Sequence, residues 1–94
     1  MDMKIIFNKP FNFEGKEYKE VNLSGMNDLT TKDLLDADKQ FNASGQMSLM
    51  NEMTTGYACI IASKSTKLPI EFFENLPANE GLKVKNTVMS FLNQ

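Results

Sequence analysis

Residues 15–39 change from a strand-like pattern to a helix-like pattern within a single short stretch of the sequence. Its first part, residues 16–23, combines charged residues with the aromatic and aliphatic side chains that strands favour. A threonine pair, Thr30-Thr31, then offers an N-cap, and Asp33 lies where a carboxylate stabilises the first helical turn. A chain with this order of signals is restricted to folds in which a β-strand is followed directly by an α-helix.

The residues before this stretch are predicted to complete an antiparallel β-hairpin over residues 1–24. Residues 3–7 are rich in β-branched and aromatic side chains, which favour a strand. Pro10 interrupts that strand and indicates an edge position or a bend, because proline cannot donate to a ladder. Gly15 supplies the positive φ that a tight turn needs. An isolated hairpin is marginal in water, so we expect this one to pack on the helices or on another protomer.

The second strand of this hairpin does not alternate strictly. Val21 and Leu23 share a face, whereas strict alternation places Tyr18 on the opposite face. Either a bulge near residues 19–20 corrects the register, or both faces of the hairpin are partly covered.

The rest of the sequence is predicted to be helical. Apolar residues recur at three- and four-residue spacing, and Gly45 is a suitable residue for the end of the first helix. Pro69 and Pro77 each open a helix, because proline suits the first helical position. The predicted helices cover residues 30–44, 48–64, 69–76 and 77–93. We therefore expect a single α+β domain over residues 1–94, with an N-terminal antiparallel β-hairpin followed by a bundle of three to four α-helices.

The composition argues against most enzymatic chemistry. The sequence has no histidine, so the usual general base and the usual imidazole metal ligand are both missing. Cys59 lies between apolar neighbours and is predicted to be a small core residue rather than a nucleophile. Asp33, Asp36 and Asp38 are predicted to form a solvated helix face, since no glycine loop of the EF-hand type follows them. We expect no enzyme activity, no metal site and no cofactor.

Charge and hydropathy argue against two classes of partner. All ten cationic residues are lysines, and nucleic-acid recognition favours arginine, so we expect no nucleic-acid partner. The longest unbroken apolar run, residues 57–62, is far shorter than a transmembrane helix, which needs about 20 apolar residues. The first residues also lack the basic and hydrophobic character of a leader. We therefore expect a soluble protein without a membrane partner, and its single cysteine fits a reducing cytoplasm.

Two groups of side chains are candidates for contacts with a partner protein. Met47, Met50 and Met53 are closely spaced, and methionine is common at adaptable binding surfaces. Their helical spacing also fits a core position, which is the interpretation it favours. Phe72 and Phe73 are adjacent on a short predicted helix, so we expect at least one of them to be exposed or in an interface.

The last predicted helix has an unusually broad apolar face. Such a face can be buried on more than one side, which favours self-association into a homo-oligomer. Its members are Leu82, Val84, Val88, Met89, Phe91 and Leu92.

The order of these segments resembles the small tail assembly chaperones of long-tailed bacteriophages and prophages. The resemblance lies in F-x-F-E-G-K-E-Y-K-E-V-N-L at residues 11–23 and L-T-T-K-D-L-L-D-A-D at residues 29–38. It continues with Y-A-C-I-I-A-S-K at residues 57–64, a Leu-Pro helix start at residues 76–77, and V-M-S-F-L at residues 88–92. These motifs cover most of the chain, and they are structural rather than chemical.

The resemblance implies a non-enzymatic role in tail morphogenesis in the bacterial host cytoplasm. Such a chaperone coats the long, hydrophobic tape measure protein and keeps it soluble. It also delivers tail tube subunits and leaves before the tail is complete. The family often makes a longer form by ribosomal frameshifting, and codons for residues 91–93 could hold a slippery sequence. No family motif places a catalytic residue in this chain.

Two alternatives stay open at the level of the sequence. The chain could be a small structural or adaptor protein that is retained in the virion, such as a head–tail joining component. It could also be a small regulatory protein that binds one bacterial target. Detection in purified virions favours the adaptor, whereas an effect on the solubility of the tape measure protein favours the chaperone.

Overall fold

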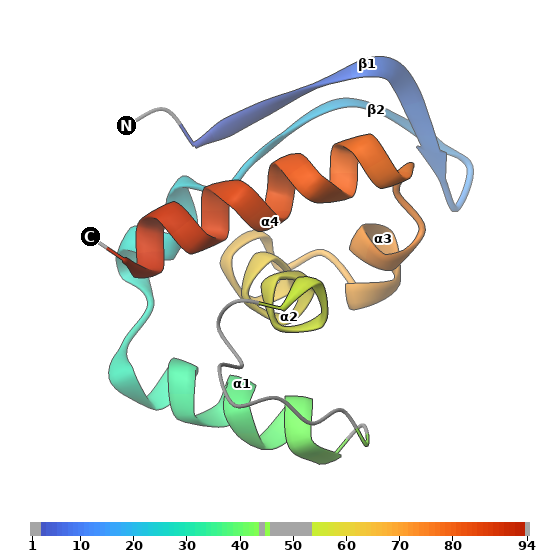
Figure 1. The fold of residues 1–94 in the computed structure, drawn as a ribbon. Helices are drawn as coiled ribbons and strands as arrows, with labels where there is room; N and C mark the ends of the chain where they lie inside the picture. The colour runs from blue at the N-terminus through green and yellow to red at the C-terminus, as the bar shows by residue number, and fades with distance from the viewer. Residues whose placement is uncertain (1–2, 44, 46–53, 94) are drawn as a thin grey trace.

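The computed structural model describes residues 3–43, 45 and 54–93, and a single helix lies at the centre of its core. The elements in chain order are β1 (Lys4–Phe13), β2 (Lys16–Asn22), the 3-10 helix η1 (Ser24–Asp28), α1 (Thr31–Ala43), α2 (Thr55–Thr66), α3 (Ile70–Glu74) and α4 (Ala78–Leu92). The predicted fold class, an N-terminal antiparallel hairpin followed by helices, is confirmed. The hairpin lies on one side of α4, and α1 lies on the far side of α2 (Figure 1).

Helix α2 is the central element because its sequence is apolar on every side. Residues 57–62 are all buried, and the helix packs against α1, α3, α4 and η1. A helix that is hydrophobic all round has to be enclosed by other elements. The predicted helix 48–64 begins in residues outside the described part of the chain. The observed helix α2 begins at Thr55, after the extended N-cap residue Thr54, and ends at Thr66, because Lys67 has the left-handed φ of 62° that stops a helix.

The hairpin turn and the cap of α1 have the geometry that the sequence predicts. Gly15 has a φ of 80° and Glu14 a φ of 51°, so that both central turn residues are left-handed. The Thr30 N–H donates to Asp33 Oδ2 at 2.8 Å, and the Asp33 N–H donates back to Thr30 Oγ1 at 3.3 Å. This reciprocal pair is a capping box that begins α1. The hydrogen bond from the Thr30 backbone lowers the pKa of Asp33.

The register irregularity of the hairpin lies on β1 and not on β2. Ile6 pairs with Glu20 and Phe11 pairs with Tyr18, so the four residues 7–10 of β1 face Lys19 alone. The predicted bulge near residues 19–20 is therefore wrong about the strand that carries the extra residues. Pro10 explains the difference, because a residue without an N–H cannot continue the ladder on β1.

The irregular part of β1 is fixed to α4 by two charged side chains, which we call the Glu80–Lys83 clasp. Glu80 is only 2% exposed, and its Oε2 accepts a hydrogen bond of 2.6 Å from the Asn8 N–H. Lys83 Nζ lies 2.9 Å from Glu80 Oε1, and it also donates to the Ile6 carbonyl and to Asn8 Oδ1. The clasp provides hydrogen-bond partners for the main-chain N–H of Asn8 and the carbonyl of Ile6. It thereby holds the hairpin on its own helices.

We expect the clasp to make the stability of the fold depend on pH. Burial raises the pKa of Glu80, but the hydrogen bonds from Lys83 and Asn8 and the charge of Lys83 outweigh it and lower the pKa overall. A carboxyl whose pKa is lower in the folded state stabilises the fold above its unfolded pKa of about 4.3. That contribution is lost as the pH falls through the folded value.

Replacing Glu80 with glutamine tests this dependence. We expect Glu80→Gln to lower the free energy of unfolding at pH 7 by about 1–2 kcal/mol, since the hydrogen bonds lose their charge. Urea unfolding at pH 7 and at pH 3 should show a smaller acid-induced loss in this variant than in the wild type. Glu17→Gln changes an exposed carboxylate on β2 and is the control. Equal acid-induced losses in the Glu80 variant and the wild type would contradict the role of the clasp.

Candidate functional site

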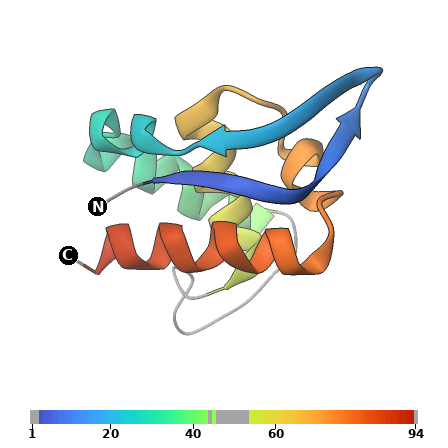
Figure 2. The ribbon, with the colours of Figure 1, turned by 90° about the horizontal axis from the view of Figure 1, so that it is seen from above.

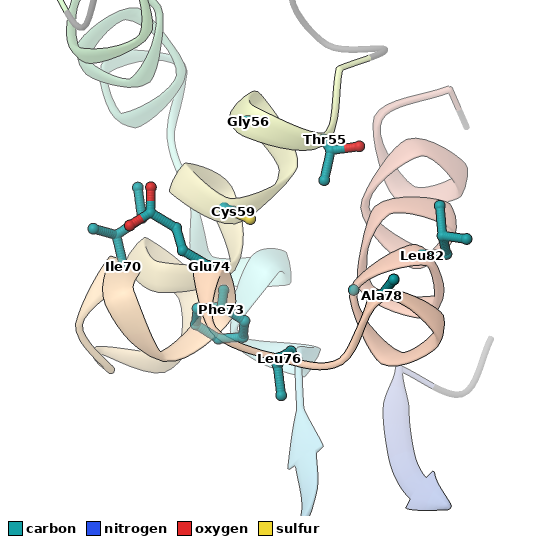
Figure 3. A pocket seen from close by; sticks show the side chains of 10 residues that line it. Thr55, Gly56, Cys59, Ile70, Phe73, Glu74, Leu76, Ala78 and Leu82 are labelled. Carbon is teal, nitrogen blue, oxygen red and sulfur yellow. The ribbon is translucent and has the colours of Figure 1, made fainter. Parts of the chain in front are cut away.

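A half-open groove of about 700 Å³ lies between α2, α3 and α4. Figure 3 shows α3 as one wall, the first turns of α4 as the other, and the start of α2 between them. We call it the α2–α3–α4 groove. Its lining residues are Thr55, Gly56, Cys59, Ile70, Phe73, Glu74, Leu76, Ala78, Gly81 and Leu82.

The lining of the groove is mainly apolar. Cys59, Phe73 and Leu76 are buried residues at its base. Leu82 stands on the α4 wall with 53% of its surface exposed. Glu74 is the only charged side chain among the described residues that line it. A concave apolar surface with few polar groups is a common form of binding site in proteins.

Phe72 and Phe73 are both buried, so neither is exposed, and a place for one of them in an interface stays a prediction. Phe72 is 0% exposed and faces the hairpin, where its ring lies 4.8 Å from that of Tyr18 and 5.2 Å from that of Phe11. Phe73 is 3% exposed and lies at the base of the groove. Two adjacent residues of α3 can both be buried because this short helix is enclosed on two sides. Only Phe73 of this pair borders the candidate site.

The three methionines proposed for partner contacts, Met47, Met50 and Met53, lie outside the described residues. Their contact with a partner stays a prediction from the sequence. The segment that carries them ends just before Thr54, and Thr55 lines the groove.

Cys59 is a buried thiol, as the sequence predicts. Burial raises its pKa, and the negative charge of Glu74 raises it further. The protonated thiol therefore predominates at neutral pH, and a protonated thiol is a poor nucleophile. Cys59 contributes apolar surface to the groove.

The apolar face of α4 divides between the core and the surface. Val84 and Val88 are buried, whereas Met89, Phe91 and Leu92 are half-buried. Leu82 is the most exposed member and belongs to the groove. Self-association through this face stays a prediction, which sedimentation of the purified chain can measure.

The groove itself was missed by sequence reasoning, although one signal could have indicated it. Gly81 interrupts the predicted helix 77–93 at a position where the pattern gives no reason for a glycine. A glycine inside a helix costs stability, so it often marks a close approach or a functional position.

The described residues hold neither a metal site nor a membrane-spanning helix. Within residues 3–43, 45 and 54–93 no group of three or more Cys, Asp or Glu side chains is arranged to hold a metal ion. In the same part of the chain, no helix combines the length and the apolar character that crossing a membrane requires.

The sequence of residues 4–93 matches the family described as "Phage tail assembly chaperone proteins, E, or 41 or 14". The match spans nearly the whole chain, from β1 to the residue after α4. This protein therefore belongs to the phage tail assembly chaperone family, and the resemblance found in its sequence is confirmed. No curated protein and no solved structure matches the chain.

Proposed function

We propose that this chaperone binds the phage tape measure protein, keeps it soluble and helps to recruit tail tube subunits while the tail is assembled in the bacterial cytoplasm. The observation that carries the proposal is the family match over residues 4–93, which gives a tail assembly chaperone role. The identity of the clients is the proposed step. They are the structural proteins of the tail that are most in need of protection before assembly, and none of the expected contacts requires catalysis.

The physical basis of the proposal is mass action on exposed apolar surface. A long rod with apolar side chains aggregates unless a partner covers it. A partner that binds only the unassembled form shifts the equilibrium away from aggregation, and it is displaced when tube subunits take its place. The α2–α3–α4 groove offers the apolar concave surface that this role needs.

Co-expression with the tape measure protein encoded by the same phage tests the proposal. We expect the tape measure protein to be recovered in the soluble fraction with this chain and in the pellet without it. The two proteins should also co-purify, and the chain should be absent from purified virions. A tape measure protein that is equally insoluble with and without the chain would refute the proposal, and retention of the chain in virions would favour a structural adaptor instead.

The methionine prediction can be tested in the same assay. We expect Met50→Ser and Met53→Ser together to reduce client affinity at least tenfold, because each buried methionine contributes about 1.5 kcal/mol or more. The thermal transition should stay nearly unchanged if these side chains contact the client. Phe73→Ser is the contrasting variant, since its burial predicts a large loss of stability. A large loss in the methionine variant as well would place Met50 and Met53 in the core.

A further inference from the structure

We propose that the α2–α3–α4 groove is the site at which one helix of the client docks, and that this helix is amphipathic, with an apolar ridge flanked by a lysine or arginine. The inference rests on the proposed function and adds the surface and the chemistry of the contact. It is drawn from a glycine that the fold does not require, from the small residues on facing helices, and from an unpaired carboxylate beside the groove.

Gly81 is a glycine that the fold itself does not require. It lies in the early part of α4 and lines the groove, and a Cβ placed on it would meet no atom within 4 Å. Its φ is not left-handed, so the backbone does not require glycine there. Alanine would be the more stable helix former at this position. A glycine that the isolated chain does not need leaves room for a group that approaches from outside.

Small residues face one another across the groove. Gly56 is in the first turn of α2, and Ala78 begins α4 on the opposite wall (Figure 3). Together with Gly81 they give α2 and α4 small residues beside larger lining residues such as Leu82. Small residues on facing helices allow another backbone to approach closely, and a helix that enters such a groove inserts side chains spaced by three and four residues. These features fit a helix of the client better than a compact small molecule.

The apolar lining of the groove indicates that the client helix carries an apolar ridge. Phe73 and Leu76 form the base, and Leu82 stands exposed on the α4 wall. A helix with an apolar stripe would cover Leu82 and remove the exposed part of the groove from water, which is a favourable change of about 25 cal/mol per Å².

Glu74 indicates which charge the client helix carries beside its apolar ridge. It is exposed at the end of α3 and forms no ion pair with any residue in the described part of the chain. Figure 3 shows its side chain beside Ile70 on the α3 wall. A lysine or arginine next to the apolar ridge of the client would pair with it.

The experiment measures binding of the full chain to overlapping 25-residue peptides that cover the tape measure protein, by fluorescence anisotropy. Gly81→Ala should raise the thermal midpoint of the chain by a few degrees. It should also lower the affinity for the tightest-binding peptide at least about tenfold, since the added Cβ occupies the path by which the client helix approaches. Gly81→Leu should weaken it further. Ser90→Ala, an exposed change in the same helix away from the groove, should stabilise the chain without changing binding.

A charge reversal tests the second part of the inference. Glu74→Lys should weaken binding about fivefold at low salt, and the effect should shrink as salt screens it. Glu71→Lys reverses an exposed charge on the same helix that does not line the groove, and it should have little effect. Replacing the facing cation of the peptide by glutamate should restore binding to the Glu74→Lys variant.

The outcomes separate the groove from the proposed function. If the wild type binds the peptides and both Gly81 variants bind them equally well, the groove is not the docking site of the client. The proposed chaperone function would still stand. If the tightest peptides are acidic or lack an apolar stripe, the stated chemistry is overturned. If Gly81→Leu dissociates a homo-oligomer of the chain in sedimentation and leaves peptide binding unchanged, a second copy occupies the groove and the inference is wrong. If the wild type neither binds nor solubilises the tape measure protein, the proposed function fails together with the inference.

Discussion

Replacing Phe72 with alanine is expected to lower the free energy of unfolding by about 4 kcal/mol, which is a large part of the stability of a domain of this size. The side chain is 0% exposed, and its ring contacts those of Phe11, Phe13, Tyr18 and Phe73 with centroid distances of 4.8–5.4 Å. These edge-to-face contacts join the hairpin to α3. Truncation therefore loses both the burial of a large ring and the contacts that hold two elements together.

Chemical unfolding of the purified variants measures the effect. Ile6→Ala is the control, because Ile6 is a large aliphatic residue of β1 that is 66% exposed. We expect that substitution to change stability by no more than about 0.5 kcal/mol. If Phe72→Ala costs as little as Ile6→Ala, the aromatic cluster does not hold the hairpin on α3. If it prevents accumulation of folded protein, Phe72→Leu supplies a milder variant with the same expected direction.

The second large effect is expected at Gly25, where alanine should cost about 3 kcal/mol. Gly25 lies in η1, and a Cβ on it would clash with the main-chain oxygen of Ser65 and lie 3.2 Å from the Ser65 carbonyl carbon. Both atoms belong to the last turn of α2, and η1 packs against that helix. A clash with a helical backbone cannot be relieved by rotating a side chain, so the two elements would have to separate.

Gly81→Ala is the matched control for Gly25→Ala, because the chemical change is identical and the surroundings are opposite. A Cβ on Gly81 meets open space, and the substitution should stabilise the fold by about 0.5–1 kcal/mol. Thermal unfolding of both variants should therefore shift in opposite directions from the wild type. Equal shifts would mean that η1 and α2 are not in the close contact described above.

Much of the fold could be predicted because its signals are local. The capping box of Thr30 and Asp33 spans four residues, and the turn at Gly15 depends on one left-handed position. The position of the irregularity on β1 was harder to predict, because two strands share one register and either can carry the extra residues. The burial of both Phe72 and Phe73 depends on the hairpin covering α3, which is a contact between distant parts of the chain.

The groove could not be predicted for a similar reason. Residues 70–82 supply the walls from α3 and α4, but the third side comes from α2, which lies earlier in the chain. Patterns of apolar residues identify surfaces that are buried, but they do not show where packing leaves a space. Gly81 lines the groove, and a Cβ on it would meet no atom within 4 Å.

The clasp of Glu80 and Lys83 has a consequence for a protein that works among polymerising subunits. A strand edge with unsatisfied main-chain groups can template the addition of foreign strands. Figure 2 shows β1 between β2 and α4, and the clasp already bonds the Ile6 carbonyl and the Asn8 N–H. The other edge of the hairpin, β2, carries the exposed charges of the segment 16–20. Both edges thus resist the addition of a strand from a neighbouring chain.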